Sequence, residues 1–276
     1  MQGLSQYTLA APVTLEGIGL HTGQPVRVVI SPGQDRHISF VRDGTRIRAD
    51  LDHVEQTSRC TSLGHNGAGV ATVEHLMATL SAFGVTSADL CVDGPEVPIM
   101  DGSAREFVRS LRGVGLLGLS GSRRVLRLSS PVWLEENGSH LLAVPSDRFR
   151  VTAAIRFEHP LVGTQISDVL VDAGTFEHEL ASARTFGFES ELEELARRGL
   201  ALGGSLENAV VFFNDKTSTP LRYPDEPVRH KAVDLIGDLA LLGAMPQAHI
   251  FALRPSHRLN IEFARRLRQN GVVSEA

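Results

Sequence analysis

Residues 228–242 read Val-Arg-His-Lys-Ala-Val-Asp-Leu-Ile-Gly-Asp-Leu-Ala-Leu-Leu, which is the sharpest helical pattern in the chain. Its apolar residues cover most of the circumference of a helix, so the sequence predicts a helix that is largely buried. His230, Asp234 and Asp238 follow one another at intervals of four residues and therefore stack along one stripe. Because buried charges must be paired or bound to a cation, the stripe indicates either a metal site or a His–Asp pair held by an arginine from elsewhere.

A second helix is predicted over residues 73–83, with Thr72 as its N-cap. Its large apolar side chains share one arc, while Glu74 and His75 share the opposite arc with small residues. Small neighbours would let another surface approach closely, and the Glu–His pair would then project into a cleft. The alternative is a solvated pair at the start of a surface helix.

Imidazole and carboxylate groups on these two helices form a donor set suited to zinc with one open position for water. The predicted ligands are His75, His230 and Asp234. A bound metal lowers the pKa of such a water toward ~7, and Glu74, next to His75, could take its proton. The pattern therefore predicts metal-assisted hydrolysis of an amide or an ester.

His257 lies at a predicted junction between a strand and a helix, within residues 254–260. Imidazole titrates near neutrality, so His257 could protonate a leaving amine. The alternative is an exposed loop histidine without a chemical role. Asp238, one helical turn beyond Asp234, could orient His257 and stabilise its charged form.

The composition is that of a globular protein: 276 residues of 29.9 kDa, 42% of them hydrophobic. A net charge of −5 makes nucleic acid an unexpected partner, because phosphates require a basic surface. Two cysteines, Cys60 and Cys91, exclude a disulfide framework and favour a reducing compartment. Residues 1–11 do not resemble a signal peptide, and no segment approaches the ~18 apolar residues of a membrane span. We therefore expect a soluble cytoplasmic protein, a monomer or weak oligomer, that can touch a membrane surface transiently.

The order of predicted elements divides the chain into two similar halves. In the first half the predicted strands and helices are 7–15, 25–31, 37–41, 73–83, 88–92 and 104–112. In the second half they are 125–128, 130–134, 141–145, 149–157, 175–183, 189–198, 208–213, 228–242, 248–252 and 258–270. Residues 113–124 between them are rich in glycine and serine, which is typical of a boundary. We therefore expect two α+β domains, residues 1–120 and 121–276, of the kind that duplication produces.

Five segments in this order along the chain resemble the UDP-3-O-acyl-N-acetylglucosamine deacetylase family. They are Gly17-Ile-Gly-Leu-His-Thr-Gly23, Thr72-Val-Glu-His-Leu76, Pro98-Ile-Met-Asp-Gly-Ser-Ala104, Arg184-Thr-Phe-Gly-Phe188 and His230-Lys-Ala-Val-Asp-Leu-Ile-Gly-Asp238. The resemblance implies a zinc-dependent enzyme that performs the committed step of lipid A synthesis in Gram-negative bacteria. It also implies a fold of two similar domains, each a β-sheet with two helices, packed with the helices face to face between the sheets. This arrangement resembles a duplication of the ribosomal S5 domain 2 type, with the site at the domain interface.

The resemblance also implies roles for individual residues. The zinc ligands would be His75, His230 and Asp234, and the catalytic groups would be Glu74 as general base, His257 as general acid, Asp238 as its support and Thr185 at the oxyanion. The substrate contacts would be His21, Lys231, Phe186 and His159. Family members have glycine before the catalytic histidine, whereas Ser256 stands there in this chain.

The implied substrate is a UDP-sugar with an amide-linked acetyl group and an ester-linked hydroxyacyl chain. The best candidate for an apolar passage for that chain is the segment from Phe186 to Leu202, ending at Gly203-Gly204-Ser205; the alternative is ordinary core packing of a helix. Two other functions remain open: a zinc amidohydrolase for another N-acetyl sugar, and a catalytically silent nucleotide-sugar-binding paralogue.

Overall fold

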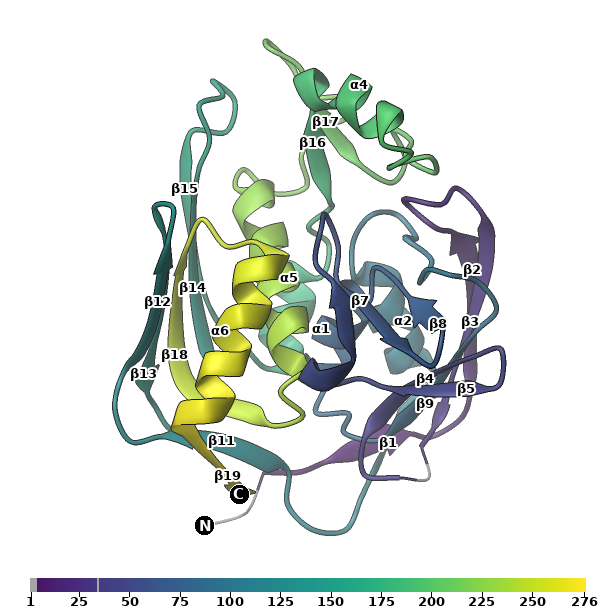
Figure 1. Cartoon of the computed structure of the whole chain (residues 1–276), viewed down its shortest axis with the longest axis vertical. Helices are drawn as coiled ribbons and strands as arrows, with labels where there is room; N and C mark the ends of the chain where they lie inside the picture. Colours follow the sequence, from purple (N-terminus) through teal and green to yellow (C-terminus); the bar gives the residue numbers. More distant parts are fainter. Residues whose placement is uncertain (1–3, 34) are drawn as a thin grey trace.

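The computed structural model describes residues 4–33 and 35–276, and its architecture is mixed α+β. Two large β-sheets stand on opposite sides of the molecule, and helices α1, α5 and α6 lie between them (Figure 1). Most of the buried apolar side chains of the sheets and helices join in one core cluster. Among the described residues, no helix combines the length and the apolar character needed to cross a membrane.

The first large sheet comes from the first half of the chain and has the strand order β2-β3-β9-β4-β5. Its strands are β2 (Val13–Ile18), β3 (Pro25–Pro32), β4 (Ile38–Arg42), β5 (Thr45–Arg48) and β9 (Ala88–Val92). Alternate residues of β3, Val26, Val28 and Ile30, have buried or nearly buried side chains, because one face of the sheet covers the core. The helices that accompany this sheet are α1 (Glu74–Ala82) and α2 (Arg105–Val114).

The second large sheet comes from the second half of the chain and is built around β18 (Met245–Leu253). This strand pairs antiparallel with β13 and parallel with both β11 and β14. The other strands are β11 (Arg124–Leu128), β12 (Val132–Glu136), β13 (Ser139–Pro145), β14 (Arg150–Arg156), β15 (Thr164–Leu170) and β19 (Gly271–Glu275). Its helices are α5 (Glu226–Ala240) and α6 (His257–Asn270).

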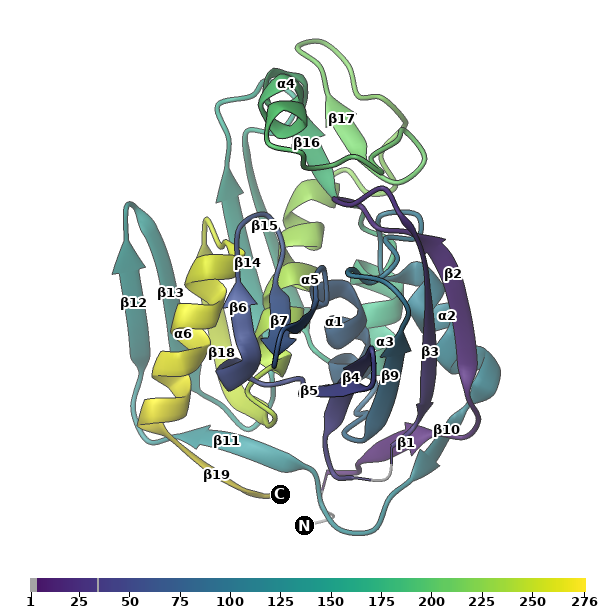
Figure 2. The same ribbon diagram turned by 45° about the vertical axis from the view of Figure 1, so that its right-hand side comes forward.

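Smaller elements complete the fold around this frame. A three-stranded sheet consists of β6 (Val54–Gln56), β7 (Ser62–His65) and β8 (Ala68–Val70), preceded by a 3₁₀ turn at Leu51–His53. An insertion consists of β16 (Phe186–Phe188), α4 (Glu189–Arg197) and β17 (Val210–Phe212), with β16 and β17 parallel. Figure 2 shows this insertion at the end of the molecule opposite the two termini.

Several sequence expectations need correction. The stretch 113–124 is not a plain linker, because it contains the end of α2, the start of β11, and β10 (Leu116–Gly118), which pairs with β1 (Tyr7–Leu9). The strand expected over 7–15 is two strands, β1 and β2, that belong to different sheets. The helix expected over 175–183 is a short α3 (Ala173–Thr175) followed by a π-helical turn, Phe176–Leu180.

The start of α1 also differs from the expectation. Val73, not Thr72, is the N-cap residue, and it makes no side-chain capping bond. Thr72 has a positive φ of 57°, and its hydroxyl donates instead to the carboxylate of Glu96, at 2.6 Å. The strands β5 to β8, β15, β16 and β19 were not expected from the sequence either, and apart from the seven residues of β15 they are too short for a two-residue alternation to stand out.

Helices α1 and α5 pack directly against each other at the centre of the molecule (Figure 2). Every residue of α1 is buried, including Glu74 and His75. At the contact, α5 presents Gly237, where an added Cβ would stand 2.0 Å from the Glu74 carbonyl oxygen. The small side chains beside Glu74 and His75 are therefore the surface against which another helix packs.

We expect Gly237→Ala to destabilise the protein, because its methyl group would collide with the backbone of Glu74. Overpacking of this kind costs roughly 1–3 kcal/mol of the free energy of unfolding, which thermal denaturation detects. Gly113→Ala is the matched control, since Gly113 is an exposed residue of α2 with nothing within 4 Å of an added Cβ. Equal melting temperatures for the Gly237→Ala variant and the wild type would contradict the packing described above.

Candidate metal centre and active site

The two central helices line a cavity of ≈ 580 Å³ together with the insertion and the start of α6. His75 comes from α1, whereas His230, Lys231 and Asp234 come from α5. Phenylalanine and leucine side chains of the insertion form the apolar part of the wall. Polar groups from both halves of the chain thus meet beside an apolar surface.

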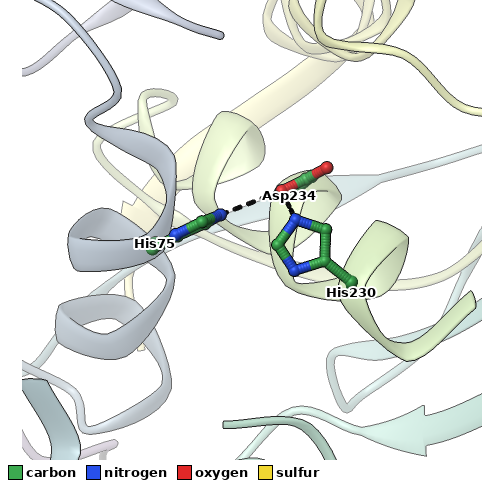
Figure 3. Close-up of side chains that lie close together, drawn as sticks. All are labelled: His75, His230 and Asp234. Carbon is green, nitrogen blue, oxygen red and sulfur yellow. Dashed lines mark ion pairs between the residues drawn. The ribbon is translucent and has the colours of Figure 1, made fainter. Parts of the chain in front are cut away.

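Three buried side chains come together where α1 meets α5. The Nε2 atoms of His75 and His230 each lie 3.4 Å from Asp234 Oδ1. Figure 3 shows the two imidazole rings, one from each helix, pointing toward the Asp234 carboxylate. One possible ligand atom from each residue lies within 4.8 Å of the others. The Nδ1 atom of His230 is 3.1 Å from the Ala183 carbonyl, a contact that turns Nε2 toward the other two residues.

The chemistry of this group fits a metal ion. Asp234 Oδ1 is buried and has no hydrogen-bond partner among the described residues, although a buried carboxylate oxygen normally has one. Burial alone would raise the pKa of Asp234, but nearby Lys231 and the neighbouring histidines hold this pKa well below its usual range. Burial lowers the pKa of His230 to about 4, so its imidazole is neutral, as a metal ligand must be. Two imidazoles and a carboxylate are a donor set that suits zinc.

Glu74 lies beside this group and is deeply buried. Its Oε2 accepts a hydrogen bond from the backbone N–H of Thr61, at 3.1 Å. Its Oε1 is 3.9 Å from Nε2 of His257. Burial raises the pKa of Glu74, and this effect outweighs the opposing attraction of His257 and His75. The carboxylate is therefore prepared to accept a proton.

His257 is not a loop residue but the first residue of α6. Its Nδ1 is 3.0 Å from Asp238 Oδ2, on the side of the ring away from Glu74. Burial would lower the pKa of His257, but the negative charges of Asp238, Glu74 and Asp234 outweigh burial and raise it to about 9. The imidazole is therefore protonated near neutral pH and can donate a proton.

Asp238 is held by two further side chains, Thr61 and Asn260, to which the sequence assigned no role. Thr61 Oγ1 donates to its Oδ1 at 2.5 Å, and Asn260 Nδ2 donates to its Oδ2 at 2.8 Å. Thr61 belongs to the segment 59–63, whose backbone also reaches Glu74. Only the folded chain brings this segment to α5 and α6, so no local pattern could have assigned a role to Thr61 or Asn260.

Ser256 occupies the N-cap position of α6, directly before His257. Its φ of −147° is extended backbone that any residue can adopt, and its hydroxyl accepts a hydrogen bond from the Leu259 N–H. Serine is among the preferred N-cap residues. The exchange of glycine for serine at this position is therefore compatible with a regular helix start and an ordered His257.

Thr185 reaches the cavity because a buried ion pair fixes the chain beside it. Arg184 Nε lies 2.8 Å from Glu226 Oε1, and the Arg184 backbone N–H also donates to that oxygen. Glu226 is the first residue of α5, so the ion pair ties the chain at Thr185 to the helix that carries His230. The Thr185 N–H donates to the Gly102 carbonyl at 2.7 Å, which joins the segment to the first half of the chain.

Three of the four predicted substrate residues line the cavity: His21, Lys231 and Phe186. Lys231 Nζ is 2.9 Å from Asp234 Oδ2 and 5.8 Å from the centre of the Phe186 ring. His159 is not among the lining residues of the cavity. Its ring packs against Phe188 and Phe212, with centroid distances of 5.1 and 5.8 Å.

The predicted apolar passage coincides with the insertion. Its lining side chains are Phe186, Phe188, Leu192, Leu195, Ala201, Ser205 and Leu206. Leu192 on α4 is 40% exposed, which is unlike ordinary core packing of a helix. Arg59 and Glu191, to which the sequence assigned no role, form an ion pair of 3.0 Å at the cavity wall and connect α4 with the first half of the chain.

Comparison with known proteins identifies a family and several relatives that are similar to this chain. The model of the UDP-3-O-acyl N-acetylglycosamine deacetylase family, LpxC, matches residues 6–269. A protein of Nitratidesulfovibrio vulgaris is 41% identical over 274 residues, which cover 97% of this chain and 89% of that protein. A protein of Syntrophotalea carbinolica is 41% identical (96% and 88% covered), and one of a Nostoc species is 40% identical (96% and 98% covered).

All three relatives are named UDP-3-O-acyl-N-acetylglucosamine deacetylase. The family match spans nearly the whole chain, including α1, α5 and most of α6. The chain therefore belongs to the UDP-3-O-acyl-N-acetylglucosamine deacetylase family.

Proposed function

We propose that the protein is a zinc-dependent enzyme that removes the N-acetyl group of UDP-3-O-(3-hydroxyacyl)-N-acetylglucosamine and releases acetate. Membership of the deacetylase family supports the reaction. The observation that carries the proposal is the meeting of His75, His230 and Asp234 with Glu74 and His257 at one end of an apolar cavity. This chemistry is that of amide hydrolysis, and the apolar wall suits a substrate with a fatty chain.

His75, His230 and Asp234 would hold the zinc ion, which would polarise the amide carbonyl and make water a stronger nucleophile. Glu74, whose raised pKa favours proton uptake, would accept the proton of the attacking water on its carboxylate. The water oxygen then forms a bond to the acetyl carbon, and negative charge develops on the carbonyl oxygen. Thr185, which lines the cavity, would donate a hydrogen bond to that oxygen.

His257 would deliver a proton from Nε2 to the sugar nitrogen as the bond between carbon and nitrogen breaks. Its Nε2 is 3.9 Å from Glu74 and also 3.9 Å from Asp234, so it faces the reacting groups. Asp238 contacts Nδ1 and keeps the imidazole charged and correctly turned. The products are acetate and the free amine of the sugar.

The substrate would lie with its acyl chain along the insertion and its nucleotide toward the polar part of the cavity. Among the described residues that line the cavity, Lys231 and Arg59 carry the lysine and arginine side chains. They are therefore the candidates for binding the diphosphate. His21 would contact the sugar. A buried chain contributes about 0.8 kcal/mol for each methylene group, so the fatty chain would supply much of the binding energy.

Other expectations from the sequence remain part of this proposal. They are a cytoplasmic location, a place at the committed step of lipid A synthesis in a Gram-negative bacterium, transient contact with a membrane surface, and a monomer or weak oligomer. The division into two duplicated domains at residue 120 is also proposed. Its support is that each large sheet, with its helices, comes from one half of the chain.

The first prediction concerns the reaction itself. We expect acetate release from UDP-3-O-(3-hydroxyacyl)-N-acetylglucosamine that a chelator abolishes and zinc restores. The same sugar without the acyl chain should react with a much lower kcat/KM. Equal rates on both substrates would favour an amidohydrolase for another N-acetyl sugar. A folded protein without bound zinc, and without any gain when zinc is added, would favour a silent paralogue.

The second prediction concerns Glu74. Glu74→Gln keeps the shape of the side chain but removes its ability to take a proton. We expect kcat to fall by about 10²–10⁴, with zinc content unchanged when measured by metal analysis. Glu16→Gln on the exposed face of β2 is the control and should keep full activity. Activity near that of the wild type would remove Glu74 from the role of general base.

The third prediction concerns the metal ligands. Asp234→Asn removes a negative charge from the metal site without changing the size of the side chain. Loss of even an indirect partner of a metal ligand costs ~10–100-fold in affinity, so we expect at least this loss in a zinc titration with a competing chelator. Asp225→Asn, at the start of the same helix, should leave zinc affinity unchanged. If both variants bind zinc equally well, Asp234 is not a ligand.

A further inference from the structure

Glu96 is a fully buried carboxylate that does not line the cavity. Both of its oxygens lie 3.1 Å from the backbone nitrogen of His21. Its Oε2 also accepts from the backbone N–H and the hydroxyl of Thr22, each at 3.1 Å. Its Oε1 accepts from the hydroxyl of Thr72 at 2.6 Å. One carboxylate thus collects donors from two segments that are far apart in the sequence.

The backbone around Glu96 is held from both sides. The Ala71 N–H donates to the Pro95 carbonyl at 2.9 Å, and the Val97 N–H donates to the Ala71 carbonyl at 3.0 Å. The Ile99 N–H donates to the Ile18 carbonyl at 2.9 Å, next to the loop that contains His21. The backbone of Glu96 is therefore held in place between the two segments that its carboxylate binds.

Thr72, the first of these contacts, controls the start of α1. Its φ of 57° is unfavourable for a β-branched residue, so the bond from its hydroxyl to Glu96 must help to hold this conformation. Thr72 stands directly before Val73, the N-cap of the helix, and Glu74 and His75 follow. The turn at Thr72 therefore determines the positions of Glu74, the proposed base, and His75, a proposed metal ligand.

The loop at residues 19–23, the second contact, forms part of the cavity wall. An added Cβ at Gly19 would stand 2.4 Å from Glu96 Oε2, so the loop lies directly on the carboxylate. The same loop reaches the insertion, because the Ala201 N–H donates to His21 Nδ1 and the Leu202 N–H donates to the His21 carbonyl. The position of His21 and of the end of the passage therefore depends on how this loop is held.

We propose that Glu96 is a positioning residue that sets the loop of His21 and the start of α1 with one buried charge. Neutral donors surround it: two backbone N–H groups and two hydroxyls. A carboxylate accepts all of them, whereas an amide in its place would present its own N–H groups to some of these donors. The consequence for catalysis rests on the proposed deacetylase function, but the positioning itself does not.

The test is Glu96→Gln, examined first by hydrogen exchange in the absence of substrate. The His21 and Thr22 amides should exchange about tenfold faster or more, because they lose bonds to a charged acceptor. Amides of β18, in the other half of the chain, should keep their wild-type rates. In the zinc-loaded enzyme, KM should rise through the misplaced loop and kcat should fall through the shifted Glu74, with zinc content maintained.

Two matched variants separate positioning from a general loss of stability. Asp93→Asn removes a nearby exposed carboxylate that binds Arg27, and it should change neither exchange in the loop nor kinetics. Thr72→Gly combined with Glu96→Gln should recover part of kcat, since glycine adopts the positive φ without help, while KM stays high. If Glu96→Gln does not fold, Thr72→Val against Thr72→Ser tests the same bond, and only valine should lower kcat.

Wild-type exchange at His21 and Thr22 in the Glu96→Gln variant would overturn the proposal. So would faster exchange that is uniform over the whole chain, because Glu96 would then only stabilise the fold. A wild-type enzyme that releases no acetate would refute the proposed function and leave the exchange result to decide the role of Glu96.

Discussion

The close packing of α1 against α5 is the contact on which the site depends. It requires a residue without a side chain at position 237, directly opposite the Glu74 carbonyl. Because the two helices lie so close together, one imidazole from each helix approaches the Asp234 carboxylate, and Glu74 lies beside them. A larger separation would leave the two helices intact and would still remove the candidate site.

The same contact buries several carboxylates close together. Hydrogen bonds and positively charged side chains compensate for their charge. Glu74, Asp234 and Asp238 are all buried, and all three carboxylates lie close to the imidazole of His257. Asp238 is paired with His257 and receives two further hydrogen bonds, whereas Asp234 is left with an oxygen that only its two imidazole neighbours face. This Asp234 oxygen is thus the position at which a cation would complete the site.

The sequence was a good guide to helices and a poorer guide to small sheets. The stripe of His230, Asp234 and Asp238 predicted α5 with its buried polar face, since a fifteen-residue helix repeats its period several times. Short strands such as β6 and β16 have three residues each, which is too few for a period to appear.

The candidate site was predictable only as far as local patterns reach. His75, His230 and Asp234 could be selected from helical spacing and donor chemistry, and the family motifs support the same choice. Thr61, Asn260 and Glu96 could not, because their partners lie in elements that are far away in the sequence. His159, which a motif assigned to the substrate, does not line the cavity but packs on Phe188, which does, so its contact with the substrate stays a prediction.

Burial of α1 on every side also has a consequence for the order of events during synthesis. Its partner α5 is made much later, so α1 leaves the ribosome without the surface that covers Glu74 and His75. At ~5–20 residues per second, this interval lasts roughly 10–30 s. During that time the first half of the chain exposes apolar surface beside two unpaired polar groups, and it is then most exposed to aggregation and to chaperones. The synthesis of α5, which covers Glu74 and His75, therefore also ends this interval of exposure for the nascent chain.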